Sequence, residues 1–446
     1  MVKMIKVALA TVGCKVNQYE TQVIRERLEK AGCDIVSFSG PAQFYIINTC
    51  SVTHQADRKS RQLIKKALKQ NRAARILVTG CLAEIEEEKL RDLSPQVEVV
   101  KNEEKLNLVE SKITPGVNLD LDYTIHGFYG HDRAFVKIED GCDQFCSYCR
   151  IPHVRGARIK SRKPEEIITE IDTLCEAGFQ ELVLTGVNLA LYGKDLPYRF
   201  SLTSLLEKII CWLSRSNRKA RIRLSSLEPH LIPEGLLDLM TETSFICPHL
   251  HLSFQSGDDE ILKKMGRNCT VSRMLSVIDK FKSRVPCLGL SGDVIVGFPG
   301  EGEKNFLNTC SFIKEAGFHR LHIFPFSPRE ETPASRMEPK VREKNKRERV
   351  KILKELSISL SEKFMTGFLG KKLPVLIETR KDLRTGYLKG YSHNYIKFLI
   401  SPTCETERFK GKIVEVRLSE VRSGFALGDI KGKKYEKTCK IKSSVG

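Results

Sequence analysis

The sequence predicts an α/β protein in three parts: a parallel α/β domain over residues 1–113, a partial barrel of six β/α units over residues 128–358, and a small OB-like β-barrel over residues 367–430. A chain of 446 residues is too long for one ordinary domain. Strand and helix patterns alternate through the first two parts, which favours parallel sheets with right-handed crossovers. Near the C-terminus only short strands separated by glycine and proline remain, which is typical of a small barrel.

The N-terminal domain is predicted from its apolar runs. Residues 7–10, 44–47 and 76–78 predict three buried strands. Helical periodicity predicts helices at residues 19–31 and 57–70, the second of them basic. The resulting β-α-β-α-β order predicts a parallel sheet.

Each of these three strands runs into a cysteine. Cys14, Cys50 and Cys81 follow the first, second and third strand, and Gly13 and Gly80 allow backbone to approach a ligand closely. Ligand sites in open α/β sheets lie beyond the carboxyl ends of the strands, so the sequence predicts that the three cysteines meet at one edge and bind metal. The alternative is three unrelated core residues, since free cysteine is often buried. Nine other cysteines are predicted to be core residues of that kind: Cys33, Cys175, Cys211, Cys247, Cys269, Cys287, Cys310, Cys404 and Cys439.

The barrel part follows a glycine- and proline-containing linker at residues 114–130. Helices such as residues 164–177 and 201–213 separate its strands, and Pro164 with the two acids after it is a good helix start. A β/α barrel places its chemistry on the loops after the strands. The six predicted strands are residues 135–138, 181–185, 221–225, 249–254, 288–296 and 320–326.

A second cysteine group lies directly after the first barrel strand. Cys142, Cys146 and Cys149 have the spacing of a turn that points three thiolates at one iron–sulfur cluster. A [4Fe–4S] cluster normally takes four thiolates, so three leave one iron open to a small molecule. The alternative is a structural zinc site with His153 as the fourth ligand, although zinc motifs usually come as two CxxC pairs.

The C-terminal part is strongly basic. A charged amphipathic helix is predicted at residues 340–366, followed by strands at residues 375–377, 395–400 and 413–418. Residues 361–446 carry 19 Lys and Arg against 9 Asp and Glu, a net charge of +10 out of +19 for the whole chain. This charge favours binding to a phosphate backbone. The alternative is a solvated face that aids solubility.

The chain is predicted to be cytoplasmic and not membrane-bound. No segment approaches the ~20 apolar residues of a membrane span, and the N-terminus has no apolar region of signal-peptide length. Fifteen cysteines cannot all pair with one another, and clusters of cysteine without a secretion signal favour metal ligation in a reducing compartment.

Several strings together resemble the radical SAM methylthiotransferase family, over almost the whole chain to about residue 430. The resemblance implies that Cys142, Cys146 and Cys149 bind a [4Fe–4S] cluster whose open iron takes S-adenosylmethionine (SAM), and that the N-terminal trio binds a second [4Fe–4S] cluster. It also implies an RNA-binding TRAM domain at the C-terminus. The strings are residues 11–17 (TVGCKVN), 47–50 (INTC), 79–81 (TGC), 142–149 (CDQFCSYC) and 293–301 (DVIVGFPGE).

The same resemblance implies how the cofactors are used. The adenine C2–H bond is too strong and nonpolar for acid–base chemistry, and in the family a radical made from SAM removes this hydrogen while the second cluster carries the sulfur. A reducing electron donor is therefore an expected partner. At Tyr148 the backbone is expected against the SAM adenine. Further SAM contacts carried over by resemblance are Gly186, Asn188, Glu228, Gln255, Arg267 and Asp293.

The family has three branches with different substrates. They modify isopentenyladenosine at tRNA position 37, threonylcarbamoyladenosine at the same position, or an aspartate of a ribosomal protein. Residues 13–17 (GCKVN) are similar to the threonylcarbamoyladenosine branch, and the basic C-terminal part agrees with binding to the anticodon arm of tRNA. The other two branches, and a non-catalytic RNA-binding protein stabilised by metal, are the alternatives.

Three residues depart from the family pattern. Phe326 and Glu331 replace a usual tyrosine and glycine in one loop, and Arg150 replaces a usual aliphatic residue after the third cysteine of the barrel. A threonylcarbamoyl group carries a carboxylate, whose burial requires a cation. Candidate cations are Arg150, Arg329 and Arg336.

Overall fold

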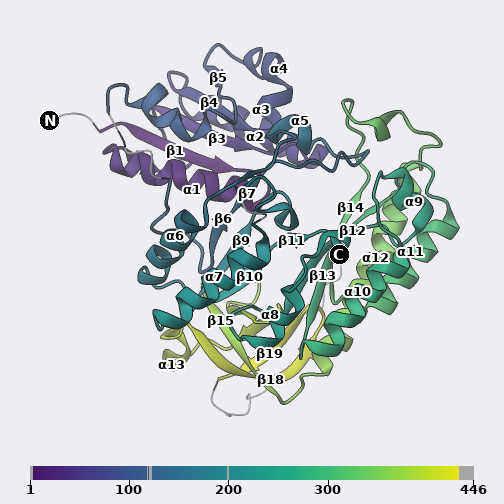
Figure 1. The fold of residues 1–446 in the computed structure, drawn as a ribbon. Helices are drawn as coiled ribbons and strands as arrows, with labels where there is room; N and C mark the ends of the chain where they lie inside the picture. Colours follow the sequence, from purple (N-terminus) through teal and green to yellow (C-terminus); the bar gives the residue numbers. More distant parts are fainter. Residues whose placement is uncertain (1–3, 118, 120–122, 198–199, 431–446) are drawn as a thin grey trace.

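The computed structural model describes residues 4–117, 119, 123–197 and 200–430. Figure 1 shows an N-terminal sheet at the top, a parallel β/α unit in the middle and a closed β-barrel at the bottom, so the two end units lie on opposite sides of the middle one. The predicted α/β architecture in three parts is confirmed. Among the described helices, none combines the length and apolarity that crossing a membrane requires.

The N-terminal unit is a five-stranded parallel sheet in the order β2-β1-β3-β4-β5. The three predicted strands are its centre, whereas β2 and β5 are three-residue edge strands too short to leave a periodic signal. The bounds are β1 Lys6–Thr11, α1 Lys15–Lys30, β2 Asp34–Val36, β3 Phe44–Thr49, α2 His54–Gln70, β4 Arg75–Gly80, α3 Cys81–Ile85, α4 Glu87–Arg91 and β5 Val97–Val99.

Helix α1 starts four residues earlier than predicted and belongs to two units. Its first two turns contain Asn17 and Glu20, which are buried although they are polar, and this obscures the apolar periodicity of the helix. Tyr19 and Val23 join the hydrophobic core of the middle unit, and the Tyr19 hydroxyl donates to Glu170 of that unit over 2.8 Å. The helix therefore fixes the N-terminal sheet to the barrel.

The predicted linker at residues 114–130 is packed over its last part. Ile125 and Phe128 are buried in the core of the middle unit, and the Phe128 ring contacts Phe135 edge to face with centroids 4.9 Å apart. Residues 118 and 120–122 of this segment lie outside the described residues. The connection thus adds to the contact between the two units.

The middle unit is an open arc of parallel strands, as predicted. One sheet has the order β10-β9-β6 and the next β11-β12-β13-β14. The chain segment 221–227 belongs to both, because β10 pairs with β9 and, after Ser225, β11 pairs with β12. The strands are β6 Ala134–Lys137, β9 Glu181–Thr185, β10 Arg221–Leu224, β11 Ser226–Leu227, β12 His249–Gln255, β13 Gly289–Val296 and β14 Arg320–Pro325.

Helices between successive strands surround this arc (Figure 1). Helix α6 has Pro164 in its first turn, and the Ser201 hydroxyl caps α7 by accepting the Ser204 N–H over 3.2 Å. Two short antiparallel strands, β7 Glu139–Asp140 and β8 Lys160–Ser161, frame the loop with the second cysteine group. The helices are α5 Ile151–Arg155, α6 Pro164–Glu176, α7 Leu202–Arg215, α8 Leu236–Glu242, α9 Asp259–Lys264, α10 Val271–Arg284 and α11 Glu303–Ala316.

The C-terminal unit is a closed five-stranded barrel in the order β15-β16-β17-β19-β18. Sequence periodicity missed β16 and β19, which contain Gly390 and Gly428. Added Cβ atoms there would lie 2.7 Å from the Leu376 carbonyl oxygen and 2.4 Å from a Val416 methyl carbon, so the barrel requires glycine. The bounds are α12 Glu343–Thr366, β15 Lys372–Lys381, β16 Leu388–Ser392, β17 Lys397–Ile400, α13 Cys404–Glu407, β18 Ile413–Arg422 and β19 Phe425–Asp429.

Buried arginines attach this barrel to the amino ends of the β/α strands. Arg221 and Arg223 donate to backbone carbonyls of the barrel, including those of Pro374 and His393 at 2.9 Å each. Both guanidinium groups contact Glu181, the first residue of β9, and hold the pKa of this fully buried carboxyl well below its usual range. The C-terminal barrel is thus at the opposite end of the strands from the loops after them.

Candidate functional site

The N-terminal cysteines meet at one edge of the first sheet, as the sequence predicts. Cys14, Cys50 and Cys81 follow β1, β3 and β4, which are neighbours in that sheet. Cys50 and Cys81 are buried and Cys14 is exposed. Burial raises the pKa of the Cys50 thiol to about 12, and the nearby thiols of Cys81 and Cys14 add to this rise.

Two glycines make this approach possible. Gly13 has φ 107°, and a Cβ there would lie 2.7 Å from the Cys50 sulfur. Gly80 has φ 94°, and a Cβ there would lie 2.2 Å from the Thr49 carbonyl oxygen. Any larger residue would force the strand ends apart.

The second trio lies on the loop between β7 and α5. The Ser147 N–H and hydroxyl donate to the backbone carbonyls of Met265 and Lys264 over 2.9 and 2.8 Å, which holds the loop against α9. Burial raises the pKa of Cys142 to about 11 and that of Cys149 to about 12, and neighbouring thiols of the trio contribute to both. Closely spaced buried thiolates require a positive partner, so both trios suit metal ligation.

The geometry suits iron–sulfur clusters better than single zinc ions. Within the described residues, the ligand atoms that lie close enough to share one ion, within 4.8 Å, are those of His251, Asp293 and His322, and neither cysteine trio is in such a group. Sulfur atoms that each bind a different iron of one cluster have no need to be that close. His153 is exposed on α5 and is not part of such a group either.

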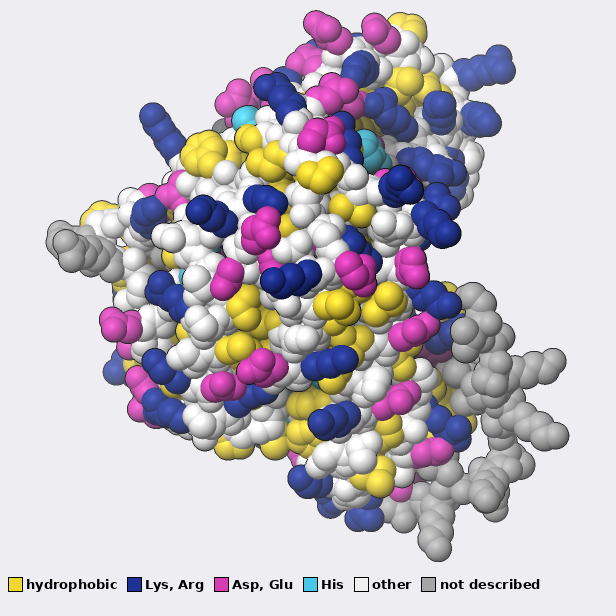
Figure 2. All heavy atoms as spheres, turned by 90° about the vertical axis from the view of Figure 1, so that its right-hand side faces the viewer, with side chains coloured by type: hydrophobic (Ala, Val, Ile, Leu, Met, Phe, Trp, Pro, Cys, Tyr) yellow, Lys and Arg dark blue, Asp and Glu magenta, His cyan; other side chains and the backbone are white. Residues whose placement is uncertain are grey.

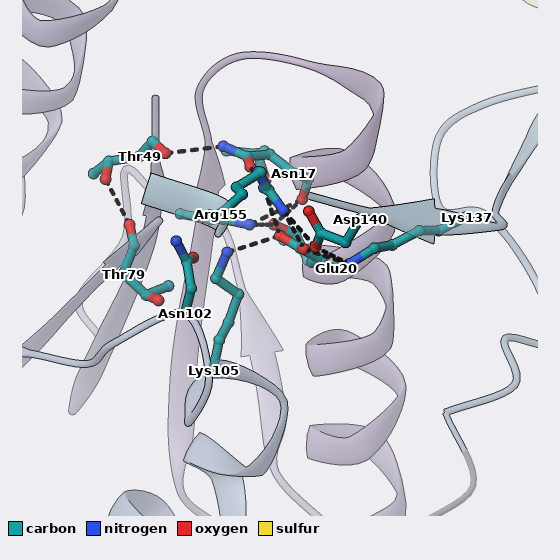
Figure 3. Close-up of polar contacts among 12 residues, drawn as sticks. Asn17, Glu20, Thr49, Thr79, Asn102, Lys105, Lys137, Asp140 and Arg155 are labelled. Atoms are coloured by element: carbon teal, nitrogen blue, oxygen red, sulfur yellow. Dashed lines mark hydrogen bonds and ion pairs between the residues drawn. The ribbon is translucent and has the colours of Figure 1, made fainter. Parts of the chain in front are cut away.

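A buried network of charges connects α1 of the first unit with β7 and α5, the elements on either side of the second cysteine loop (Figure 3). The Arg155 guanidinium donates to Glu20 over 2.8 Å, to Asp140 over 3.0 Å and to Asn17 over 2.5 Å. Lys105 and Lys137 approach Glu20 from two sides, with Nζ–Oε distances of 2.7 and 2.9 Å. The network therefore fixes α1 of the first unit against the cysteine loop of the second.

Several residues of this network are close to a cysteine along the chain. Asn17 follows Cys14 by three residues, and its amide donates to the carbonyls of Val12 and Thr49 over 2.9 Å each, beside Cys14 and Cys50. Arg155 also lowers the pKa of Cys81 against the larger effect of burial. Sequence reasoning missed Glu20, Lys105 and Arg155, because isolated charged residues carry no pattern.

The structure brings several of the predicted SAM contacts together. Arg267 pairs with Glu228 and also donates to the Tyr148 hydroxyl over 3.2 Å and to the Ser253 carbonyl over 2.6 Å. The Ser253 hydroxyl donates to Asp293 over 3.0 Å, so these residues form one connected group. Asp293 also contacts His251 at 3.0 Å.

The other predicted contacts lie at neighbouring strand ends. Gly186 and Asn188 follow β9 and pack on Glu139, whose carboxylate accepts the Asn188 N–H. A Cβ on Gly186 would lie 2.2 Å from a carboxylate oxygen of Glu139. Gln255 ends β12 with a φ of 65°. The structure adds Glu139, a residue that the sequence did not single out; burial raises its pKa to about 8.

Of the three arginines considered for the substrate carboxylate, Arg150 and Arg329 contact the N-terminal unit just after Cys50, at Ser51 and Asp57. Arg150 donates to Glu331 over 2.5 Å, and Arg329 donates to Asp57 of α2 over 2.5 Å. Arg336 is exposed on the same loop as Arg329. Arg150 and Glu331, two of the three departures from the family pattern, are thus partners of each other.

Comparison with known proteins supports the sequence resemblance. Two family models match, Uncharacterized protein family UPF0004 over residues 6–101 and Radical SAM superfamily over residues 136–313. The chain is 38% identical to the threonylcarbamoyladenosine tRNA methylthiotransferase MtaB of Thermotoga maritima, covering 88% of this chain and 90% of that protein. It is 37% identical to the protein of the same name from Bacillus subtilis, covering 93% of this chain and 94% of that protein. It is also 31% identical to a tRNA-2-methylthio-N(6)-dimethylallyladenosine synthase of Alkaliphilus oremlandii, with 95% and 92% coverage.

Solved structures share the fold at low sequence identity. The radical SAM methyltransferase TsrM of Kitasatospora setae, with cobalamin and a [4Fe–4S] cluster bound, superposes with a TM-score of 0.53 at 14% identity, covering 75% of this chain and 77% of that one. The structure of the same enzyme with tryptophan and a SAM analogue bound superposes with a TM-score of 0.55 at 12% identity, covering 95% of this chain and 85% of that one.

Proposed function

Because the chain belongs to the radical SAM methylthiotransferase family, we propose that it converts N6-threonylcarbamoyladenosine at position 37 of tRNA to its 2-methylthio derivative. The observation that carries the proposal is the pair of cysteine trios, with a buried network between the two units that contain them. Cys142, Cys146 and Cys149 would hold a [4Fe–4S] cluster together with SAM, and Cys14, Cys50 and Cys81 would hold a second cluster. When bound, these groups supply the radical and sulfur chemistry that a C2–H bond requires.

The residues of the chain bind and orient the cofactor. Tyr148, Arg267 and Glu228 form a connected polar wall beside the second trio. Two further polar atoms nearby, the side-chain Nδ2 of Asn188 and Oε2 of Glu139, are buried without a hydrogen-bond partner in the part of the chain that the structure describes. Unpaired buried polar atoms are costly, so they favour a polar ligand in this place.

The network of Figure 3 has a positioning role in this proposal. A rate gain from orientation requires that the reacting groups stay in fixed positions. The network binds α1, which follows Cys14, to Asp140 and Arg155, which flank the loop that contains Cys142. Its buried hydrogen bonds are charge-assisted and therefore stronger than neutral ones. Burial also keeps water away from reactive intermediates.

The charged surface supports an RNA substrate. Figure 2 shows lysine and arginine side chains gathered on one side of the upper lobe, whereas both signs of charge are mixed on the body below. Helix α2 in the first unit has a run of exposed cations and lies beside the edge with the cysteines. Its exposed cations are Arg58, Lys59, Lys65, Lys66 and Lys69.

The choice of base rests on residues 13–17 (GCKVN) and on the similar proteins named for threonylcarbamoyladenosine. The test is mass spectrometry of tRNA nucleosides after reaction of the reconstituted enzyme with tRNA that bears each modified adenosine. We expect the 2-methylthio product on threonylcarbamoyladenosine. Product only on isopentenyladenosine would overturn the choice of base, and absence of SAM cleavage would overturn the enzyme class.

A further inference from the structure

Arg150 and Glu331 form an ion pair next to the second cysteine trio. The pair joins the loop after Cys149 to the loop that follows β14, with 2.5 Å between Nη2 and Oε2. The Arg150 side chain is 7% exposed and that of Glu331 is 31% exposed. The cation is thus fixed inside the protein, whereas its partner is at the surface of the site.

Residues of the N-terminal unit also bind the Arg150 side chain, on a different guanidinium nitrogen from the one that contacts Glu331. The Nη1 of Arg150 donates to the carbonyl oxygen of Ser51 over 3.1 Å and to the Ser51 hydroxyl over 2.5 Å. Ser51 follows Cys50 and donates in turn to Asp57 over 2.6 Å. Arg150 itself follows Cys149, and its guanidinium group contacts the residue that follows Cys50, so it connects one cysteine of each trio.

A second buried cation, Arg329, faces the same place. Its Nη1 donates to Asp57, and its side chain is 4% exposed. Its Nε and Nη2 atoms, and the Nε of Arg150, are buried without a hydrogen-bond partner among the residues described. Arg150 and Arg329 together also hold the pKa of Glu331 below its usual range against the effect of burial, so this carboxylate lies in the field of both cations.

The loop with Glu331 is anchored to both units. The Ala334 N–H donates to the carbonyl of Ser147, in the second cysteine loop, over 2.8 Å. The Ser327 hydroxyl accepts the N–H of His54, at the start of α2, over 3.3 Å. Glu331 lies between these two anchors on a partly exposed stretch, where its side chain can turn into water.

We propose that Arg150 and Arg329 form a receptor for an oxyanion of the RNA substrate, and that Glu331 fills this receptor until the substrate displaces it. This inference rests on the proposed function, because the oxyanion it assigns first is the carboxylate of the threonylcarbamoyl group; a backbone phosphate shares the same chemistry. Exchange of one carboxylate for another keeps the cation paired. An apolar substituent that displaced Glu331 would leave the buried cation unpaired, which is strongly unfavourable.

Binding of synthetic anticodon-arm RNA tests the receptor without turnover. Three RNAs differ only at position 37: threonylcarbamoyladenosine, its methyl ester and adenosine. We expect the holoenzyme to bind the acid about tenfold or more tightly than the ester. Arg150→Met should remove this preference, Arg150→Lys should retain part of it, and Glu331→Gln should strengthen binding of the acid while leaving the ester unchanged.

A matched control is Arg347→Met, which removes an exposed arginine from α12. It should leave the ratio of acid to ester affinity as in the parent protein. If Arg150→Met weakens all three RNAs equally and lowers the salt dependence, the oxyanion is a backbone phosphate. Unchanged affinities for all three RNAs in both Arg150→Met and Glu331→Gln, with iron content and melting temperature preserved, would overturn the receptor. The proposed function would survive that result, since it is judged by the nucleoside product.

Discussion

Of the six clustered cysteines, all but Cys14 are buried or half-buried, and burial disfavours a bare thiolate at these five positions. Sequence spacing predicted both trios because strand ends and a short turn are local features. It could not predict Glu139 or Arg155, whose importance comes from burial beside partners that are distant along the chain.

The two trios should be separable by single substitutions. Reconstituted protein should hold about eight irons if both centres are [4Fe–4S], and about four after loss of either one. Cys142→Ala should abolish SAM cleavage, whereas Cys50→Ala should leave cleavage and stop sulfur insertion. Iron analysis and product chromatography measure both. Cys287→Ala, at an exposed cysteine outside the trios, is the control. Methylthio product from the Cys50 variant would rule out the assigned role of the first trio.

Glu139 should make stability depend on pH. Burial raises the pKa of this carboxyl to about 8, whereas an unfolded glutamate has a pKa of about 4.3. The folded state therefore holds the proton more tightly, and its stability should fall as pH rises from about 4.3 to about 8. Glu139→Gln should flatten this part of the profile. Melting temperatures measured between pH 6 and 9 test this, and parallel curves for the two proteins would contradict the assignment.

At the scale of elements, the sequence predicted long, apolar strands well and missed short or irregular ones. All six barrel strands match to within one residue at each end, because their sequences are either short apolar runs, as in β9, or alternate polar and apolar residues, as in β10 and β12. The strands β2 and β5 have three residues each, and β16 and β19 contain glycines imposed by close packing. The start of α1 was missed because its inward face serves a polar network rather than a core.

That network should be a major stabiliser of the contact between α1 and the cysteine loop. Arg155→Met removes one partner of the buried Glu20 and leaves Lys105 and Lys137 in place. Breaking a buried pair costs about 3–5 kcal/mol, and the remaining lysines put this case at the lower end. Denaturant unfolding of the holoenzyme measures the shift. Arg91→Met, at an exposed pair with Glu87, should change stability by less than about 0.5 kcal/mol. Equal effects of the two substitutions would refute a special role for the network.

At the scale of the whole molecule, the C-terminal barrel has like charges side by side. Lys372 of β15 lies directly opposite Arg417 of β18, and both side chains are exposed. Like charges in this arrangement are destabilising by themselves, and a phosphate backbone would offset the repulsion. This supports the interpretation of the basic charge as an RNA surface.

Lys372→Gln and Arg417→Gln should each weaken tRNA binding and lower the slope of log affinity against log salt by about 0.7 to 0.9. SAM cleavage should persist, because β15 and β18 belong to the barrel at the amino ends of the β/α strands, whereas the second cysteine trio lies on a loop after the first of these strands. Binding titrations at several salt concentrations provide the measurement. Single substitutions are preferable to deletion of the barrel, since deletion would expose Arg221 and Arg223, which are buried against it. Unchanged slopes would move the RNA surface to α2.

Because the barrel is attached to the amino ends of the β/α strands, a fixed distance separates it from the carboxyl ends of those strands. The eight residues of β13 span about 26 Å at the usual rise per residue, and this length separates the barrel from the strand ends beside the cysteines. An RNA that touches both ends is held at two points a fixed distance apart. The enzyme can then select a base by the distance, along the folded RNA, between that base and the part of the RNA that contacts the C-terminal barrel. This selection requires no contact with the atoms of the base itself.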